Sequence, residues 1–410
     1  MKVLILSQYF WPESFRINEV ARSLRDTGCE ITILTGQPNY PDGGTFPGYS
    51  AFSTQVEDHD GLTIYRVPLV PRGHGSAFKL IANYISFIIF ASLFGPWLLR
   101  GQRFELVFVY GVSPILKIFP AMVIRRLKSA ALVTWVQDLW PESLEVTGFV
   151  RNARVLSAVS RVVGWLYQQN DLVLVQSRGF VPLVAAMSGA TPVEYHPNPG
   201  ELAFSNQPEG PPDLVLKPGF NIVFAGNLGT VQALETILSA ADQLRDMHDV
   251  RFVLIGSGSR SEWLAQEVHR LALGNIELAG RFAPESMPGI LAQASALLVS
   301  LVRDPVLSQT VPSKIQAYLA AGRPVIASLD GEGARVICAA GAGVVCAAEN
   351  PDALAASVRA LHALSSDERA QLGQAGRRYY QNNFEPSALA LRLKNRFELL
   401  LTTSNKANAL

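Results

Sequence analysis

Cysteine is scarce in this sequence, and its scarcity excludes two classes of protein. The 410 residues include only Cys29, Cys338 and Cys346, and no Cys-x-x-Cys pair is present. An odd, widely spaced set of thiols supports neither a disulfide scaffold nor a cysteine zinc cluster. We therefore predict three free thiols in a reducing compartment.

Charge is also low, and it is balanced. Charged residues make up 17% of the chain, and 35 lysines and arginines against 34 aspartates and glutamates leave a net charge of +1. A protein that coats nucleic acid usually carries a strong basic excess, so this balance argues against that function. The apolar share of 49% predicts a large core, and the length predicts two or three domains.

The N-terminus lacks the pattern of a signal peptide. The apolar run that follows Lys2 is short, and the bulky, partly polar run Tyr9–Glu13 comes directly after it. A signal peptide would need a longer apolar region and a small-residue cleavage site. We interpret Lys2–Gln8 as a buried first strand and expect the chain to stay in the cytoplasm.

One long segment, Leu80–Leu99, contains no charged residue. As a helix it would extend about 30 Å, which is enough for a bilayer core. Strand-like runs precede and follow it, at Gly61–Val67 and Phe104–Tyr110, and a connection between two strands of one sheet cannot cross a membrane. Two alternatives remain: a crossover helix packed on the sheet, or a helix lying in the membrane interface.

The same segment predicts an exposed apolar surface. Aromatic residues recur every three or four positions and so predict one helical stripe: Tyr84, Phe87, Phe90, Phe94 and Trp97. If that stripe faces the sheet, another apolar side remains, with Ile81, Ile85, Ile88 and Leu99. Basic residues lie nearby in the sequence: Arg72, Lys79, Arg100, Arg103, Lys117, Arg125, Arg126 and Lys128. We therefore expect peripheral attachment to the inner face of the cytoplasmic membrane, strengthened by anionic lipid.

Strand-like runs alternate with helical patterns along the whole chain, which is typical of βαβ units and parallel sheets. The runs of the first half are Lys2–Gln8, Glu30–Thr35, Leu62–Val67, Glu105–Tyr110, Ala131–Val136, Asp171–Val175 and Val193–His196. The pattern restarts with Phe220–Ala225, Val250–Ile255, Ile276–Leu278, Ala296–Ser300, Pro324–Ala327 and Gly343–Val345.

This order predicts an α/β protein with two Rossmann-like domains, residues 1–197 and 220–385, facing each other across a cleft. Residues 198–219 are rich in proline and glycine and read as a linker. The helical tail 386–410 is expected to pack back on the first domain. Ligands of open α/β sheets bind beyond the carboxyl ends of the strands, so we expect the site there.

A glycine-rich turn, Gly226-Asn227-Leu228-Gly229, lies between a predicted strand and a predicted helix, and Gly256 repeats the theme after the next strand. Glycine lets the backbone approach a ligand, and the free amides of the following helix suit phosphate. An ordinary tight turn has the same pattern, so both interpretations stay open.

A lysine lies at an unusual place in the helix predicted over Ser313–Ala321. Pro312 and Ser313 are typical helix-start residues, which puts Lys314 in the first turn, where a cation opposes the helix dipole. An anion bound beside Lys314 would explain the placement. A solvated lysine is the alternative.

Two carboxylates follow a predicted strand of the first half. Asp138 comes directly after Ala131–Val136, at the expected carboxyl edge of the sheet, and Glu142 is four residues later. Such a pair can serve as base and hydrogen-bond anchor. Alternatively, Asp138 caps the helix that follows Pro141.

The motifs of both halves together resemble the family-4 glycosyltransferases of the GT-B fold. Within that family they are similar to the WbuB-like and WcaI-like group, transferases of L-fucosamine or exopolysaccharide sugars. The resemblance spans nearly the whole chain and is carried by Gln8–Glu13, Thr35–Pro41, Val136–Ser143, Gly226–Gln232, Pro312–Tyr318 and Asp330–Gly333.

The resemblance implies roles for particular residues. The donor side would comprise Gly226, Asn227, Leu228, Gly229, Gln232, Gly256, Arg281, Thr310, Pro312, Ser313, Lys314, Glu332 and Gly333, with Arg303 an alternative to Arg281. The acceptor side would comprise Trp11, Glu13, Arg16 and Asn18, and the catalytic groups Asp138, Glu142 and Lys314. The sequence departs from the family at Gln309 and Ala317, where two glutamates are usual, so the carboxylate that holds the nucleotide ribose is missing.

The function implied is that of a retaining transferase. It would move a sugar, such as N-acetyl-L-fucosamine, from a UDP-sugar to a lipid-linked (undecaprenyl-diphosphate-type) saccharide in O-antigen, lipopolysaccharide, capsule or exopolysaccharide synthesis. No metal or other cofactor and no nucleic acid partner are expected. Asp58-His59-Asp60 matches the metal motif of the other large glycosyltransferase fold, but we interpret it as a turn. Two rival hypotheses are a nucleotide-sugar 2-epimerase of the same fold and a non-catalytic scaffold.

Overall fold

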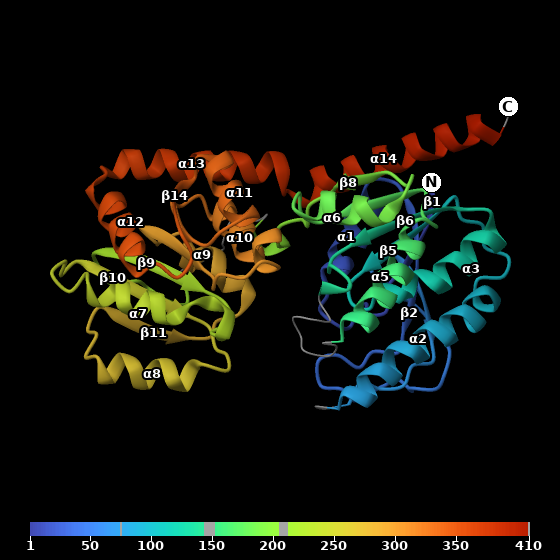
Figure 1. The fold of residues 1–410 in the computed structure, drawn as a ribbon, viewed down its shortest axis with the longest axis horizontal. Helices are drawn as coiled ribbons and strands as arrows, with labels where there is room; N and C mark the ends of the chain where they lie inside the picture. The colour runs from blue at the N-terminus through green and yellow to red at the C-terminus, as the bar shows by residue number, and fades with distance from the viewer. Residues whose placement is uncertain (74–75, 143–151, 205–211, 409–410) are drawn as a thin grey trace. The chain divides into compact units, whose positions relative to one another are not determined.

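The computed structural model describes residues 1–73, 76–142, 152–204 and 212–408, and the chain divides into two compact units (Figure 1). The first unit is Met1–Pro197 together with Pro386–Leu410, and the second is Asn198–Glu385. Each unit contains its own sheet and its own hydrophobic core. Residues from Asn198 onward, expected as linker, thus belong to the second unit.

The first unit is built on an eight-stranded sheet in the order β3-β4-β2-β1-β5-β6-β7-β8. The strands are β1 (Lys2–Leu6), β2 (Glu30–Gly36), β3 (Gln55–His59), β4 (Leu62–Val67), β5 (Leu106–Gly111), β6 (Ala131–Val136), β7 (Leu172–Val175) and β8 (Val193–Tyr195). All neighbouring strands pair in parallel except β3, which is antiparallel to β4. The parallel strands confirm the predicted α/β class, and their positions match the predicted runs to within two residues at each end.

The sequence analysis missed β3, and its interpretation of Asp58-His59-Asp60 as a turn was wrong in part. Asp58 and His59 are strand residues paired with Thr63 and Leu62, and only Asp60 and Gly61 form the turn, both with positive φ. The error has a physical cause, since β3 is an edge strand with a charged, half-exposed sequence that lacks the apolar pattern of a buried strand.

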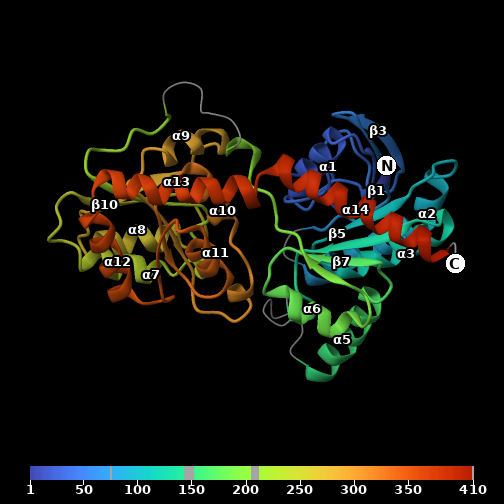
Figure 2. The same ribbon diagram turned by 90° about the horizontal axis from the view of Figure 1, so that it is seen from above.

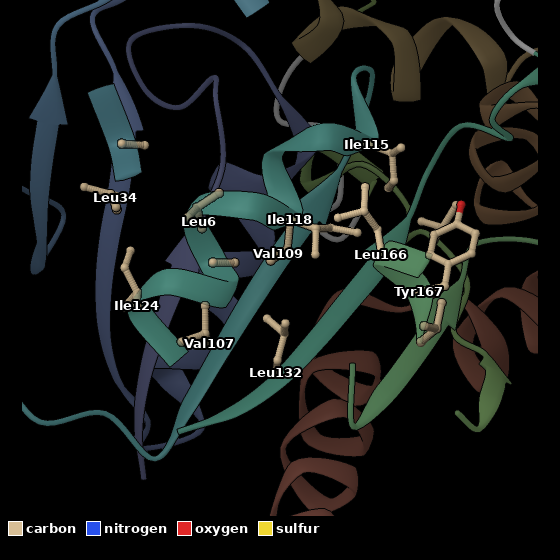
Figure 3. Packing of buried hydrophobic residues seen from close by; sticks show 14 of the residues in the cluster. Leu6, Leu34, Val107, Val109, Ile115, Ile118, Ile124, Leu132, Leu166 and Tyr167 are labelled. Atoms are coloured by element: carbon tan, nitrogen blue, oxygen red, sulfur yellow. The ribbon is translucent and has the colours of Figure 1, made fainter. Parts of the chain in front are cut away.

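Helices cover both faces of this sheet. One face packs against α2 (Ala77–Leu98), α3 (Ile118–Lys128), α5 (Ala153–Tyr167) and α6 (Phe180–Ser188), and the other packs against α1 (Arg16–Asp26) and α14 (Pro386–Asn408). Figure 3 shows side chains of the first layer, with Ile118 and Ile124 of α3 above Val107 and Val109 of β5. Seen from above, α14 runs beside α1 (Figure 2).

Helix α2 connects β4 to β5 within this single sheet, as the flanking strands predicted. Its buried residues are mostly small or polar, namely Asn83, Ser86, Ala91 and Gly95, together with the large ring of Phe87. By length and composition α2 could cross a membrane, and 22% of its most apolar window is buried. Its position between two strands of one sheet excludes a crossing while the sheet is intact.

The prediction of which α2 residues are buried and which are exposed was partly wrong. Phe87 is fully buried whereas Trp97 is 53% exposed, so the aromatic residues do not share one environment. Leu99, expected on the exposed side, is buried beneath the helix end. The exposed residues instead follow a spacing of three or four that starts one turn earlier: Phe78, Ile81, Ile85, Ile89, Leu93 and Trp97. We call this set the apolar stripe.

The second unit contains a six-stranded, fully parallel sheet in the order β11-β10-β9-β12-β13-β14. Its strands are β9 (Phe220–Ala225), β10 (Val250–Ile255), β11 (Ile276–Gly280), β12 (Ala296–Ser300), β13 (Val325–Ser328) and β14 (Gly343–Cys346). One face packs against α7 (Leu234–Asp242), α8 (Ser261–Arg270) and α12 (Pro351–Ala363). The other packs against α9 (Met287–Leu291), α10 (Ser313–Ala321), α11 (Glu332–Ala340) and α13 (Ser366–Asn383).

The last helix is integral to the first unit. Phe397 is fully buried, and its ring lies edge-on to Phe108 of β5 at 5.3 Å between centroids. Arg396 adds a bidentate ion pair with Glu194 of β8, at 2.6 and 2.7 Å. A helix encoded about 190 residues after the first unit's last strand therefore completes its core.

Removal of this ring should destabilise the first unit selectively. We expect Phe397→Ala to lower its free energy of unfolding by about 3–5 kcal/mol, the usual cost of truncating a buried phenylalanine. Leu399→Ala is the matched control, because Leu399 is 57% exposed on the same helix and should change stability by less than about 0.5 kcal/mol. Urea unfolding followed by tryptophan fluorescence measures both, and equal losses would contradict the packing.

Candidate functional site

Two glycines at the carboxyl ends of β9 and β10 form the floor of a pocket in the second unit. Gly226 and Gly256 have φ of +138° and +136°, a region that favours glycine. A Cβ on Gly256 would lie 1.8 Å from the carbonyl oxygen of Gly226, and one on Gly226 would lie 2.5 Å from Cε of Lys314. Both positions therefore require glycine, which confirms the tight turns, while the approach of a ligand stays a prediction.

Lys314 lies in the first turn of α10, directly above this floor. Its ammonium is 3.5 Å from the centroid of the Phe224 ring and donates a hydrogen bond of 2.5 Å to Oε1 of Gln232. Burial lowers the pKa of Lys314 to about 7. No described carboxylate forms an ion pair with it, and Lys314 is only partly exposed, which favours the anion interpretation over a fully solvated lysine.

Tyr318 fixes α10 against the end of β9. Its buried hydroxyl accepts a hydrogen bond from the backbone N–H of Ala225, at 2.8 Å, and donates to the carbonyl oxygen of the same residue, at 3.3 Å. Because Lys314 is one turn earlier on this helix, the clamp also sets the position of its side chain above Gly226.

The pocket between these elements has a volume of about 700 Å³. Eight of the residues assigned to the donor side by resemblance line it: Gly226, Asn227, Gln232, Gly256, Arg281, Pro312, Ser313 and Lys314. Arg303 does not line the pocket and pairs with Asp330. Among the two arginines considered, the structure therefore brings Arg281 to the site.

The other five assigned residues lie outside the lining and stabilise the surrounding loops: Leu228, Gly229, Thr310, Glu332 and Gly333. Leu228 is buried, and its carbonyl accepts the N–H of Arg260. The hydroxyl of Thr310 donates to the carbonyl of Leu307. Glu332 is buried at the start of α11, where it pairs with Arg335.

Glu201 and Phe204 are among the lining residues that sequence reasoning missed. Both belong to the segment interpreted as a linker, where no motif or periodicity marks them. Ala317, one of the two departures from the family pattern, also lines the pocket and presents only a methyl group. Among the described lining residues, Glu201 is the single carboxylate.

Asp138 lies at the carboxyl edge of the first unit's sheet, where it ties two strand ends together. Its Oδ2 accepts hydrogen bonds from the backbone N–H of Ser113, at 2.7 Å, and from the Ser113 hydroxyl, at 2.8 Å. The Trp140 indole donates to the same hydroxyl at 3.1 Å. Within the described residues, the hydrogen-bond partner of Asp138 comes from the loop after β5, and most of the segment after Pro141, where a capped helix would lie, is outside the described residues.

Lys117 contradicts its expected role as a membrane contact, because its side chain is fully buried. Burial lowers the pKa of Lys117 to about 7, and Asp138 is the charge that opposes this shift. Among the described residues the amine has no hydrogen-bond partner, and neither do Oε2 of Glu142 and the hydroxyl of Tyr167. Figure 3 shows the Tyr167 ring beside Leu166, with its hydroxyl on the side of Ile115. Ser143, part of the same motif, lies outside the described residues.

The residues expected on the acceptor side divide into two groups. The buried carboxylate of Glu13 accepts backbone N–H bonds from Phe10, Asn39 and Tyr40, at 2.8–3.2 Å, and burial raises the pKa of Glu13 to about 7. Asn18 closes the same turn by accepting the N–H of Trp11.

Two residues of this set are more accessible. The Trp11 ring stacks on His59 at 3.7 Å between centroids, and Arg16 begins α1 in a half-buried position. We conclude that Glu13 and Asn18 shape the loop, while Trp11 and Arg16 stay the candidates for contact with a ligand. Within the described ranges, no three His, Cys, Asp or Glu side chains are grouped to hold a metal ion.

Comparison with known families agrees with this geometry. Residues 14–199 match the family described as "Glycosyl transferase 4-like domain", and residues 219–363 match "Glycosyl transferases group 1". Together these matches cover most of the chain, one in each unit. The chain belongs to the glycosyltransferases with these two domains, which confirms the resemblance and the enzyme class.

Two relatives are similar over most of their length. A protein of Escherichia coli strain K12 named as a colanic acid biosynthesis glycosyl transferase, WcaI, is 26% identical over 340 residues, which are 78% of this chain and 82% of the relative. A Pseudomonas aeruginosa protein named as a glycosyltransferase, WbjE, is 26% identical over 321 residues, 75% of this chain and 78% of the relative.

Solved structures show the same fold. Sucrose-phosphate synthase from Thermosynechococcus elongatus has a TM-score of 0.71 at 15% identity, covering 98% of this chain and 99% of the other. Anabaena HepE in complex with UDP has a TM-score of 0.66 at 13% identity, covering 97% and 100%. An Escherichia coli trehalose-6-phosphate structure with UDP-2-fluoro glucose has a TM-score of 0.71 at 12% identity, covering 97% and 99%. The chain therefore has the GT-B fold.

Proposed function

We propose that this glycosyltransferase transfers a sugar, such as an N-acetylated amino sugar, from a UDP-sugar to a lipid-linked saccharide with retention of configuration. The reaction would serve the synthesis of a surface polysaccharide at the cytoplasmic membrane. The observation that carries the proposal is the partly buried ammonium of Lys314, which has no carboxylate partner among the described residues and lies at the start of a helix above two glycines.

The diphosphate of a nucleotide sugar fits this arrangement. The backbone N–H groups of Ser313 and Lys314 are free at the start of α10, and the helix dipole favours an anion there. Negative charge grows on the leaving diphosphate as the sugar bond breaks, so a fixed cation at this place stabilises the transition state more than the ground state. HepE, one of the structural relatives, contains UDP in its complex.

The first unit would supply the acceptor side. Asp138 is fixed by Ser113 at a sheet edge where ligands of α/β proteins bind, which suits a polar group near the reacting centre. The proposal assigns neutralisation of the diphosphate to Lys314, so we expect turnover to survive EDTA. Donor turnover without any acceptor would favour the epimerase hypothesis, and absence of turnover with donor binding would favour the scaffold.

The proposed membrane contact depends on the apolar stripe of α2. Its residues are about half exposed or more, and they extend along the whole helix. An apolar patch of this extent usually marks a membrane or a protein partner. Arg100 stacks on Trp97 at one end, and Arg103 and Arg126 are exposed nearby without a described partner, which favours an anionic lipid surface.

Donor affinity should depend on pH through Lys314. In the free protein its pKa is about 7, and the diphosphate favours the charged form, so binding takes up a proton above that pH. Affinity for UDP-sugar should therefore be level below about pH 7 and fall as the pH rises to about 8.5. Lys314→Met should weaken binding roughly ten- to hundredfold and remove this slope.

Isothermal titration calorimetry with a panel of UDP- and GDP-sugars measures both effects. Lys217→Met is the matched control, because Lys217 is exposed in the same unit and pairs with Glu277 outside the pocket. An unchanged affinity in Lys314→Met would place the diphosphate elsewhere.

Asp138→Asn should lower kcat by at least about tenfold while donor affinity and melting temperature stay near wild type. The amide keeps the size of the side chain and an oxygen that can accept from Ser113. Asp58→Asn, an exposed change in β3, is the control. A large loss of stability with normal kcat would show that Asp138 is structural.

Flotation with liposomes tests the membrane contact. We expect the wild-type protein to float with vesicles, more so when they contain phosphatidylglycerol. The variant Ile85→Ser/Ile89→Ser/Leu93→Ser should stay soluble, and Val56→Ser, an exposed apolar change in β3, should float normally. Recovery of all wild-type protein in the soluble fraction with every lipid would contradict the proposed membrane contact.

A further inference from the structure

The charges in the pocket of the second unit are unequally distributed. Lys314 and Arg281 are basic, and Glu201 is the one acidic residue among the described lining residues. An anionic ligand gives no reason for a carboxylate in its site. Glu201 must therefore have a role toward another part of the ligand, or be incidental to the pocket.

The backbone around Glu201 is fixed in place on both sides of the residue. The carbonyl of Asn198 accepts a hydrogen bond from Nε2 of Gln316 on α10 at 2.8 Å, and Gly200 N–H donates to the carbonyl of Phe384 at 2.8 Å. Gly200 also allows close passage over a ring, since a Cβ there would lie 2.3 Å from Cε2 of Tyr380. Directly after Glu201, the short helix η2 (Leu202–Phe204) packs against α9 and α10.

The carboxylate itself is uncommitted. No hydrogen bond or ion pair of the Glu201 side chain is formed with the described residues, although Lys314 and Arg281 line the same pocket. Its backbone carbonyl closes the turn of η2 by accepting the N–H of Phe204. Glu201 is thus held at the pocket wall by its main chain, with a free side chain.

The surroundings of Glu201 indicate which part of the ligand it meets. Lys314, Ala317 and Tyr318 are spaced i, i+3 and i+4 on α10, so they present one face to the pocket. Lys314 marks the diphosphate end, and Ala317, roughly one turn or 5 Å further, leaves space beside it. Apolar side chains form the wall on the side of η2 and α9, with Phe204, Met287 and Leu291. Such a wall suits a nucleobase.

A group that lies between a diphosphate and a base is a ribose. Its vicinal hydroxyls are two hydrogen-bond donors, and an ionised carboxylate has acceptors only, so the two match. We propose that Glu201 binds the ribose hydroxyls of the donor and makes the pocket specific for ribonucleotides. This inference rests on the proposed nucleotide-sugar donor, and it assigns to Glu201, directly before η2, a contact that the methyl group of Ala317 cannot make.

The test compares UDP with 2′-deoxy-UDP in wild type, Glu201→Ala and Glu201→Gln by calorimetry. We expect wild type to bind UDP roughly ten- to hundredfold more tightly than 2′-deoxy-UDP. This ratio corresponds to the usual free energy of one hydrogen bond to a charged group. In Glu201→Ala the two Kd values should become equal, through weaker binding of UDP alone. Glu285→Ala is the matched control, exposed beside the pocket but outside its lining, and should keep the preference.

A second variant separates the role of the carboxylate from damage to the loop. Glu201→Ala/Ala317→Glu places a carboxylate on the pocket face of α10, and a restored preference for UDP would support the proposal. Equal binding of both nucleotides by wild type, or an unchanged preference in Glu201→Ala, would overturn it while donor binding stands. An effect of Glu201→Ala on UDP-sugar but not on UDP would overturn it in favour of the transferred sugar. Failure of wild type to bind any nucleotide would overturn the proposed function as well.

Discussion

The burial of one lysine ammonium is the constraint on which the second unit's site depends. An amine at the start of a helix opposes the helix dipole, and burial adds a desolvation cost that lowers the pKa of Lys314 to about 7. The Phe224 ring and the Gln232 amide oxygen offset part of that cost. Because Gly226 and Gly256 have no side chains, Lys314 packs closely over Gly226, and the carbonyl of Gly226 packs closely on Gly256. Burial of this ammonium costs free energy in the ligand-free protein, and a bound anion would offset that cost.

The carboxyl edge of the first unit's sheet shows a similar imbalance. Asp138 is hydrogen-bonded by Ser113, yet within the described ranges the buried amine of Lys117, the Oε2 atom of Glu142 and the Tyr167 hydroxyl have no hydrogen-bond partner. Buried polar atoms in folded proteins almost always find partners. Each unit thus has, beyond its strand ends, a lysine amine that pairs with no described carboxylate, in the region where α/β proteins bind ligands. The rest of each sheet is a conventional apolar core.

Local signals in the sequence predicted most of the strands and the helix start at Lys314. Buried parallel strands are continuous apolar runs, so thirteen of the fourteen were found, and the Pro-Ser-Lys helix start marked Lys314 correctly. The failures share one physical cause, because they depend on contacts distant in sequence. Edge strand β3 has no apolar pattern, Lys117 looks like any surface lysine, and Glu13 is buried only because the loop from β2 brings Asn39 and Tyr40 onto it. Glu201 follows a proline-rich segment, and only the fold brings it to the pocket.

Helix α2 shows how composition and topology together limit what a segment can do. Four of its five buried residues are small or polar, and at Gly95 the helix lies close to the sheet: a Cβ there would be 3.0 Å from Leu34. Asn83 on that side also forms hydrogen bonds with Gln8 and Val70, which a spanning helix could not keep. Phe87 is the large apolar residue buried on this side, while Phe90, Phe94 and Leu98 are partly buried against the core. The residues of the apolar stripe face outward, so α2 has more large apolar side chains than the sheet face covers.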